Sequence, residues 1–409
     1  MTAQLTRLAN GLTVAIDPMP GARSTAIGLY AGVGSRSEVD GKGGLAHLLE
    51  HMVFKGAGGR DARAIAEAIE DVGGSLNAWT ARDQTVFHAR TLPADVDLAL
   101  ELIADLVRAP KIDEAELERE KQVILSELGE CLDAPDDLIH DHLFEAALGT
   151  QPLARPVLGR EESILALTRD DCVRWLAEEY RPSRLVISAA GAVDPDAVLA
   201  LAEKLFGDLD PVQPAAIAPA QFTGGIRSDR KAAEQTHLAF ALPGLPSSDD
   251  DAPALALFSQ AVGGGMSSRL FQELREERGM AYSIYSWTQS FADIGLFAVN
   301  LSTDKARAAE AMVLARDCVS RAAEGLTDAE LDRARAQVEA GLIMALETAQ
   351  GRADSMARSI EIFNRIMTLD EMLDEMRQVT AYTARNAAQS MLSGPIALAS
   401  IGGKLALAA

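Results

Sequence analysis

The feature that most constrains the fold is a charged segment that occurs twice in the chain. Residues 114–120 read Glu-Ala-Glu-Leu-Glu-Arg-Glu, and residues 328–334 read Asp-Ala-Glu-Leu-Asp-Arg-Ala. Strand-like and helix-like patterns precede both copies in the same order, which indicates an internal duplication of about 200 residues. Because strand, helix and hairpin patterns are mixed within each half, we predict an α+β fold with two duplicated domains, each a sheet with helices packed on one face.

A proline-rich stretch marks the boundary between the two halves. Residues 208–225 carry three prolines among alanine and glycine, a composition typical of a linker. We predict an N-terminal domain at 1–210, this linker, and a C-terminal domain at 226–409, enough chain for two domains of ordinary size. Within the first half, the patterns predict strands at 12–16, 25–30, 76–80, 85–90 and 184–191, and helices at 43–55, 61–72, 94–107, 113–131 and 136–148.

The candidate chemistry is concentrated in residues 43–56, which contain the pattern His-x-x-Glu-His. In a helix, His47 and His51 are four residues apart, so they project from one face and can bind a single zinc ion. Glu50 emerges beside them, where its carboxylate can take a proton from a catalytic water. The neighbouring residues are mostly apolar, and histidines without partners in such a helix would cost several kcal/mol.

A hydrolytic zinc site needs a third protein ligand, and two glutamates are candidates. Residues 113–128 form a strong helical pattern without glycine or proline. Glu120 and Glu127 are seven residues apart in this segment and share one face. The residue pattern alone does not choose between them.

The two motifs together resemble the pitrilysin/insulinase family of metallopeptidases. His-x-x-Glu-His is followed at 118–127 by Glu-Arg-Glu-Lys-x-x-Ile-Leu-x-Glu, and the similarity continues through residues 74–80 and 267–271. Within the family, the chain resembles the β subunit of mitochondrial processing peptidase and its bacterial relatives. The resemblance implies that Glu127 is the third ligand and that Glu120 supports the site.

The resemblance also implies where a substrate binds. The strand that contains Asn77 and Ala78 would pair with the extended substrate backbone, a mode with weak sequence specificity. Asp137 and Asp141, four apart on a predicted helix, would hold a substrate arginine next to the cleavage point. A solvated acidic turn is the alternative interpretation of these two residues.

A further pair lies in the second half of the chain. The resemblance implies that Arg275 and Tyr282 reach the catalytic site, where the arginine fixes substrate carbonyls and the tyrosine donates to the developing oxyanion. The alternative is a surface arginine and a buried tyrosine. Ala334 and Gly341 stand where the first half has its two glutamates. The histidine positions correspond approximately to Ala256 and Gln260, so the second half has none of the ligands and we expect one Zn²⁺ per chain.

These observations predict a zinc endopeptidase with Glu50 as general base, and the resemblance implies that its substrates are short or unfolded peptides. The resemblance implies a closed chamber, of which a two-domain chain supplies half of the clamshell, so we expect a homodimer. The alternative is a non-catalytic structural subunit like the respiratory-complex core proteins that resemble this family. Those proteins have degraded zinc motifs, whereas every ligand and the base are present here.

Composition limits the partners. The chain has 60 acidic and 38 basic residues, a formal net charge of −22, which argues against nucleic acid and anionic membranes as partners. The same charge favours basic peptides, although it also serves solubility. Three scattered cysteines fit a reducing compartment. No apolar run approaches a membrane span, so we expect a cytoplasmic protein with no membrane partner.

The remaining histidines are weaker candidates. His88 alternates within a predicted strand and is interpreted as structural. His140 and His142 are two residues apart on a predicted helix, so they cannot share a face. We interpret both as surface residues.

Overall fold

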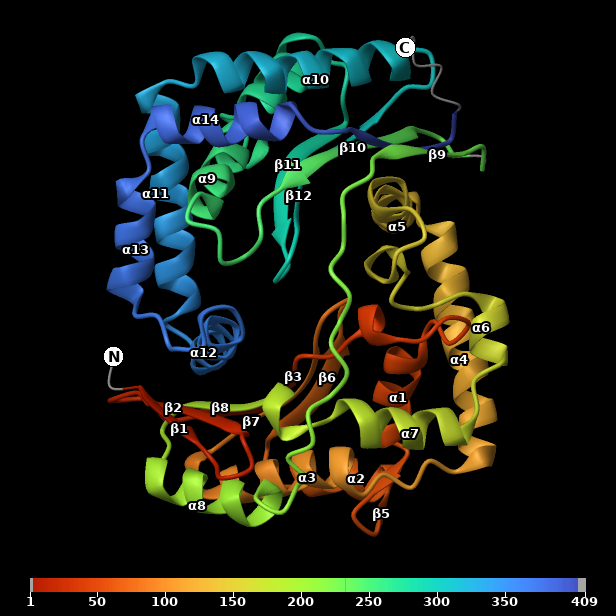
Figure 1. Cartoon of the computed structure of the whole chain (residues 1–409), viewed down its shortest axis with the longest axis vertical. Helices are drawn as coiled ribbons and strands as arrows, with labels where there is room; N and C mark the ends of the chain where they lie inside the picture. The colour runs from red at the N-terminus through yellow and green to blue at the C-terminus, as the bar shows by residue number, and fades with distance from the viewer. Residues whose placement is uncertain (1–2, 232, 404–409) are drawn as a thin grey trace. The chain divides into compact units, whose positions relative to one another are not determined.

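The computed structural model describes residues 3–231 and 233–403, so the outer ends of the two predicted domains lie outside the described residues. Two compact units are present, and each combines a β-sheet with helices (Figure 1). The predicted α+β class with two sheet-and-helix domains is therefore confirmed. The first unit contains the chain up to Leu128, Arg155–Ala218 and Ile343–Thr368; the second contains Gly129–Ala154, Pro219–Leu342 and the chain from Leu369 onward.

The sheet of the first unit has six strands in the order β1-β2-β8-β3-β7-β6. Only β2 and β8 run parallel, and β6 pairs along one side, with β7. A short β4–β5 hairpin lies outside this sheet. The strand bounds are β1 (Gln4–Arg7), β2 (Thr13–Pro18), β3 (Thr25–Ala31), β4 (Gly56–Ala57), β5 (Arg60–Asp61), β6 (Ser75–Thr80), β7 (Thr85–Thr91) and β8 (Leu185–Gly191).

Helices cover one face of this sheet and form the core of the first unit. Leu29, Phe87 and Ile187 from the sheet are fully buried in the same apolar cluster as residues of α1, α3 and α8. The helices of the N-terminal half are α1 (Leu45–Val53), α2 (Ala62–Glu70), α3 (Val96–Arg108), α4 (Glu114–Asp133), α5 (Pro135–Leu148), α6 (Glu161–Leu165), α7 (Arg169–Glu179) and α8 (Pro195–Phe206).

The second sheet repeats the topology of the first. Its order is β11-β12-β10-β13-β9, with β9 and β13 parallel, which matches the series β6-β7-β3-β8-β2 strand for strand. Its elements are β9 (Gly225–Asp229), β10 (Thr236–Gly244), α9 (Ala252–Gly263), a π-helical segment (Phe271–Glu277), β11 (Ser283–Ser290), β12 (Gly295–Thr303), α10 (Ala308–Gly325), α11 (Asp328–Ala345), α12 (Ala349–Phe363), α13 (Leu369–Gln378), α14 (Ala381–Leu392) and β13 (Ala397–Ile401).

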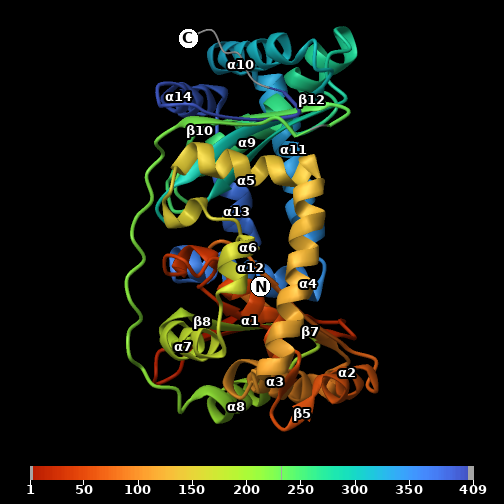
Figure 2. The same ribbon diagram turned by 90° about the vertical axis from the view of Figure 1, so that its right-hand side faces the viewer.

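Two helices pack on the sheet of the other half of the chain. α5 comes from the N-terminal half, yet it lies against β10 and β13 of the second sheet (Figure 2). Its Phe144 packs against Phe291, between β11 and β12, at 6.1 Å between ring centroids. α12 comes from the C-terminal half and covers the opposite face of the first sheet. There Met356 and Ile360 pack against Ala15. The compact units therefore depart from two contiguous domains by this helix exchange, and each sheet has helices on both faces rather than on the one face predicted.

The segment between α8 and β9 contains no helix or strand. It includes residues 208–224 of the predicted linker, whose last residue, Gly225, begins β9. The boundary between the two units falls between Ala218 and Pro219. No helix among the described residues is long and apolar enough to cross a membrane.

Candidate metal centre

The apolar residues of α1 face the core, and its polar residues lie on the remaining face of the helix. Its six apolar residues are buried, whereas His47, Glu50 and His51 are half-buried on the remaining face. The spacing of three and four residues places these three side chains together. The helix begins after Gly44, whose φ of 89° is a left-handed conformation that glycine adopts without strain.

A buried carboxylate holds the N-terminus of α1. Glu38 accepts hydrogen bonds from the backbone N–H of Gly44 at 3.1 Å and of Ala46 at 2.9 Å. These bonds satisfy two donors that an isolated helix would leave unpaired. Burial raises the pKa of Glu38 to about 8, although both backbone bonds act in the opposite direction. The start of the helix is therefore fixed by a residue that lies outside it.

Three candidate ligands converge at this face. One donor atom each from His47, His51 and Glu127 lie within 4.8 Å of one another. The Glu127 Oε2 atom is 3.9 Å from Nε2 of His47 and 3.7 Å from Nε2 of His51. Donors around a tetrahedral zinc ion lie roughly 3.3 Å apart, so each of these two distances would contract by about half an ångström if the residues held the ion. Two imidazoles and one carboxylate with an open fourth position are a donor set of catalytic zinc sites.

Glu120 orients one of these histidines. Its Oε2 atom lies 3.1 Å from Nδ1 of His51, which leaves Nε2 of that ring facing Glu127. The Glu120 carboxylate is buried, and Lys55 neutralises it through a contact of 2.7 Å between Nζ and Oε1. A carboxylate that fixes the ring orientation of a metal-binding histidine is a recurrent partner in such sites.

His47 is suited to bind a cation as a neutral imidazole. Burial, together with the nearby His51, lowers the pKa of His47 to about 4. Its Nδ1 atom is buried and has no hydrogen-bond partner among the described residues. The ring is therefore uncharged at neutral pH, with Nε2 directed toward Glu127.

Glu50 lies beside this group. Burial raises its pKa, the neighbouring Glu127 acts in the same direction, and the hydrogen bond from Thr80 and the nearby His51 oppose the shift. The Thr80 hydroxyl donates to Oε2 of Glu50 at 2.5 Å. A carboxylate whose pKa is raised toward neutrality can both accept and return a proton.

Asn77 and Ala78 lie on β6, at the edge of the first sheet. Asn77 is exposed and Ala78 is buried, as the alternation of a strand requires. Among the described residues, β6 pairs with β7 alone, so its other side is available for a further strand. α1 packs beside β6, so this open edge and the candidate metal centre belong to the same region.

Asp137 and Asp141 lie on α5 and therefore belong to the second unit. Burial raises the pKa of Tyr285 on β11, and the charges of Asp136 and Asp137 add to this shift. That these acidic residues bind substrate stays a prediction.

The prediction that both histidines of α5 lie at the surface was wrong for His142. His142 is buried rather than at the surface, because it faces the second sheet from α5. His140 is half-buried, with its Nε2 atom 3.3 Å from the hydroxyl of Tyr285. Spacing along one helix did not reveal that a sheet from the other half of the chain covers this face.

Arg275 and Tyr282 also belong to the second unit. The Arg275 guanidinium lies over the ring of Phe271, 4.7 Å from its centroid. Tyr282 is 54% exposed, so it is not the buried tyrosine of the alternative interpretation, and its hydroxyl donates to Asp304 at 3.1 Å. This bond raises the pKa of Tyr282.

The repeated positions in the second half have no comparable group. Ala334 and Gly341 lie on α11, the counterpart of α4, while Ala256 and Gln260 lie on α9. Among the described residues, His47, His51 and Glu127 are the one group found with metal-binding geometry.

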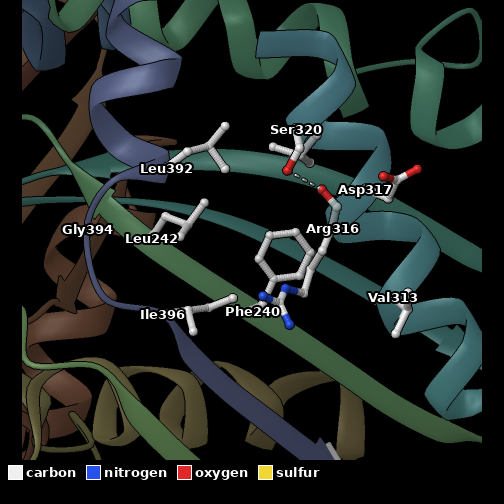
Figure 3. A pocket seen from close by; sticks show the side chains of 10 residues that line it. Phe240, Leu242, Val313, Arg316, Asp317, Ser320, Leu392, Gly394 and Ile396 are labelled. Carbon is white, nitrogen blue, oxygen red and sulfur yellow. Dashed lines mark hydrogen bonds between the residues drawn. The ribbon is translucent and has the colours of Figure 1, made fainter. Parts of the chain in front are cut away.

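A cavity of about 470 Å³ in the second unit has a different character (Figure 3). Phe240 and Leu242 of β10 line it on one side, and Arg316 and Asp317 of α10 line it on another. No histidine, cysteine or glutamate is among its described lining residues, so the cavity offers no comparable set of metal ligands.

Sequence reasoning missed three residues that support the site: Glu38, Lys55 and Thr80. Lys55 follows His51 by four residues, so helix spacing alone would have placed the two near one another. Glu38 and Thr80 contact the helix from a loop and from a strand, and such contacts have no signal in the local sequence pattern.

The duplicated sheets and the His-x-x-Glu-His helix define the class of inverted-motif zinc peptidases. Residues 13–161 match the family model described as insulinase, peptidase family M16, and residues 166–338 match the model of the peptidase M16 inactive domain. This chain belongs to the M16 family.

Two relatives match this chain over most of their own length. An uncharacterized zinc protease of Streptomyces coelicolor is 36% identical over 411 residues, which cover 98% of this chain and 90% of the relative. The uncharacterized zinc protease YmxG of Bacillus subtilis is 32% identical over 394 residues, 96% of each chain. These names support a zinc-type peptidase.

Solved structures share the fold. A crystal structure described as a peptidase M16 inactive domain from Pseudomonas fluorescens superposes with a TM-score of 0.90 at 25% identity, covering 100% of this chain and 99% of the other. A protease from Helicobacter pylori gives a TM-score of 0.89 at 23% identity, covering 98% and 99% of the two chains.

Proposed function

We propose that this chain is a zinc endopeptidase in which His47, His51 and Glu127 hold the ion and Glu50 is the general base. The observation that carries the proposal is the convergence of these three donors within 4.8 Å beside the carboxylate of Glu50. When bound, zinc supplies Lewis acidity that polarises the scissile carbonyl and activates water. Glu50 takes a proton from the attacking water and returns it to the leaving amine nitrogen.

The surrounding residues complete the proposed site. Glu120 keeps Nε2 of His51 available by holding Nδ1. An extended peptide adds to the open side of β6, where Asn77 and Ala78 supply backbone hydrogen bonds. This mode of binding reads the substrate main chain, so we propose broad specificity for short or unfolded peptides.

Charge and assembly extend the proposal. Asp137 and Asp141 favour substrates with an arginine close to the cleavage point, in line with the net charge of −22. We further propose a homodimer, because a two-domain chain supplies half of the closed chamber that the family resemblance implies. In that assembly Tyr282 donates to the developing oxyanion and Arg275 holds a substrate carbonyl.

Peptide cleavage by the Glu50→Gln variant tests the proposal. The amide keeps the shape of the side chain but cannot accept the proton, so turnover of a fluorogenic peptide should fall by about 10²- to 10⁴-fold while zinc content stays unchanged. Glu70→Gln, an exposed residue on α2, is the matched control and should retain wild-type turnover. Turnover near wild type in Glu50→Gln, or no cleavage by the zinc-loaded wild type, would contradict the proposed function.

A further inference from the structure

The proposed base is held by one specific hydrogen bond. The Thr80 hydroxyl donates to Oε2 of Glu50 at 2.5 Å. No other hydrogen bond to the Glu50 side chain is found among the described residues. The other oxygen of Glu50, Oε1, has no such partner among them and is not buried, so it is in contact with solvent. One carboxylate oxygen is thus fixed, and the other is left for a water molecule.

Thr80 is a rigid donor because of its place in the sheet. It is the last residue of β6 and pairs directly with Thr85 of β7. The backbone N–H of Ala81 donates to the carbonyl of Gln84 at 2.7 Å and closes the turn that follows. The Thr85 hydroxyl donates to the carbonyl of Val33 at 2.9 Å in a buried position. The branched side chain of threonine adds few rotamers to this fixed backbone.

Glu50 needs a partner that fixes the orientation of its side chain. A glutamate side chain has three rotatable bonds, but the oxygen of a general base must lie within about 2.6–3.2 Å of the oxygen atom whose proton it takes. A displacement of 1 Å can reduce turnover by roughly 100-fold. The same strand carries Ala78 on the same face, two residues before Thr80, so β6 connects the proposed substrate edge to the base.

We propose that Thr80 is a positioning residue that orients Glu50 for proton transfer, an inference that rests on the proposed peptidase function. Thr80→Val keeps the shape of the side chain and removes the donor, whereas Thr80→Ser keeps the donor. Thr91→Val on β7 is the matched control, because the Thr91 hydroxyl is buried without a hydrogen-bond partner among the described residues.

Steady-state kinetics on a fluorogenic peptide separates positioning from a structural role. Thr80→Val should lower kcat by about 10- to 100-fold, with KM, zinc content and thermal midpoint close to wild type. Thr80→Ser should recover most of the lost kcat, and Thr91→Val should match wild type. An unchanged kcat in Thr80→Val would overturn the inference, and so would equal losses in the valine and serine variants or a loss of zinc.

A crystal structure of zinc-loaded Thr80→Val gives a readout that does not depend on activity. The Glu50 carboxylate should leave the orientation that it has in the wild type, whereas Thr80→Ser should preserve it. An unchanged Glu50 orientation in the valine variant would overturn the inference. If the wild type cleaves no peptide, the proposed function fails, and this structural comparison still decides whether Thr80 orients Glu50.

Discussion

Replacement of Glu120 by glutamine should weaken zinc binding although Glu120 is not a ligand. The wild-type carboxylate serves two donors, Nδ1 of His51 at 3.1 Å and Nζ of Lys55 at 2.7 Å. A glutamine has one acceptor oxygen, so these donors compete for it, and the orientation of the His51 ring is no longer fixed. Loss of such a partner typically lowers metal affinity 10- to 100-fold, which is about 1.4–2.7 kcal/mol.

A competition titration measures this effect directly. Metal-free protein is titrated with zinc in the presence of a chromophoric chelator, and circular dichroism confirms that each variant is folded. Glu118→Gln is the matched control, since its side chain lies on the same helix and is 67% exposed. Zinc affinity of Glu120→Gln equal to that of the wild type and of Glu118→Gln would refute the assigned role of Glu120.

Two further predictions concern substrate charge and stability. Replacement of both Asp137 and Asp141 by asparagine should reduce the preference for peptides with an arginine near the cleavage point by about 1–3 kcal/mol. This preference is measured as the ratio of kcat/KM for arginine-containing and arginine-free peptides. Equal wild-type rates for the two peptides would contradict the prediction. Tyr30→Phe should lower the free energy of unfolding by about 1 kcal/mol in urea titrations, because it removes the 2.5 Å hydrogen bond from Tyr30 to Asp354 that ties α12 to β3. Tyr382→Phe, at an exposed hydroxyl, should have no effect, and equal losses in both tyrosine variants would contradict this role.

Helical periodicity predicted much of the candidate site. The pattern indicated a helix at 43–55, the structure has it at Leu45–Val53, and the spacing of His47 and His51 is sufficient to place both on one face. Periodicity did not choose between Glu120 and Glu127, because residues seven apart occupy the same face. The structure separates them: Glu120 lies at Nδ1 of His51, whereas Glu127 lies near Nε2 of both histidines.

The exchange of α5 and α12 between the two sheets had no signal in the sequence. An apolar helix face packs equally well on either of two similar sheets, and the duplication makes the two sheets alike. For the same reason the burial of His142 was not predicted. The bond between Thr80 and Glu50 joins a strand and a helix 30 residues apart, and such a contact depends on tertiary packing.

The zinc content of the purified protein tests the central claim most directly. Elemental analysis should find one zinc per wild-type chain after purification without chelators, and none in a variant with His47→Ala and His51→Ala. Chelation should abolish peptide cleavage by the wild type, and added zinc should restore it. A wild-type chain without zinc, or a double variant that retains the metal, would contradict the assignment of His47, His51 and Glu127 as its ligands.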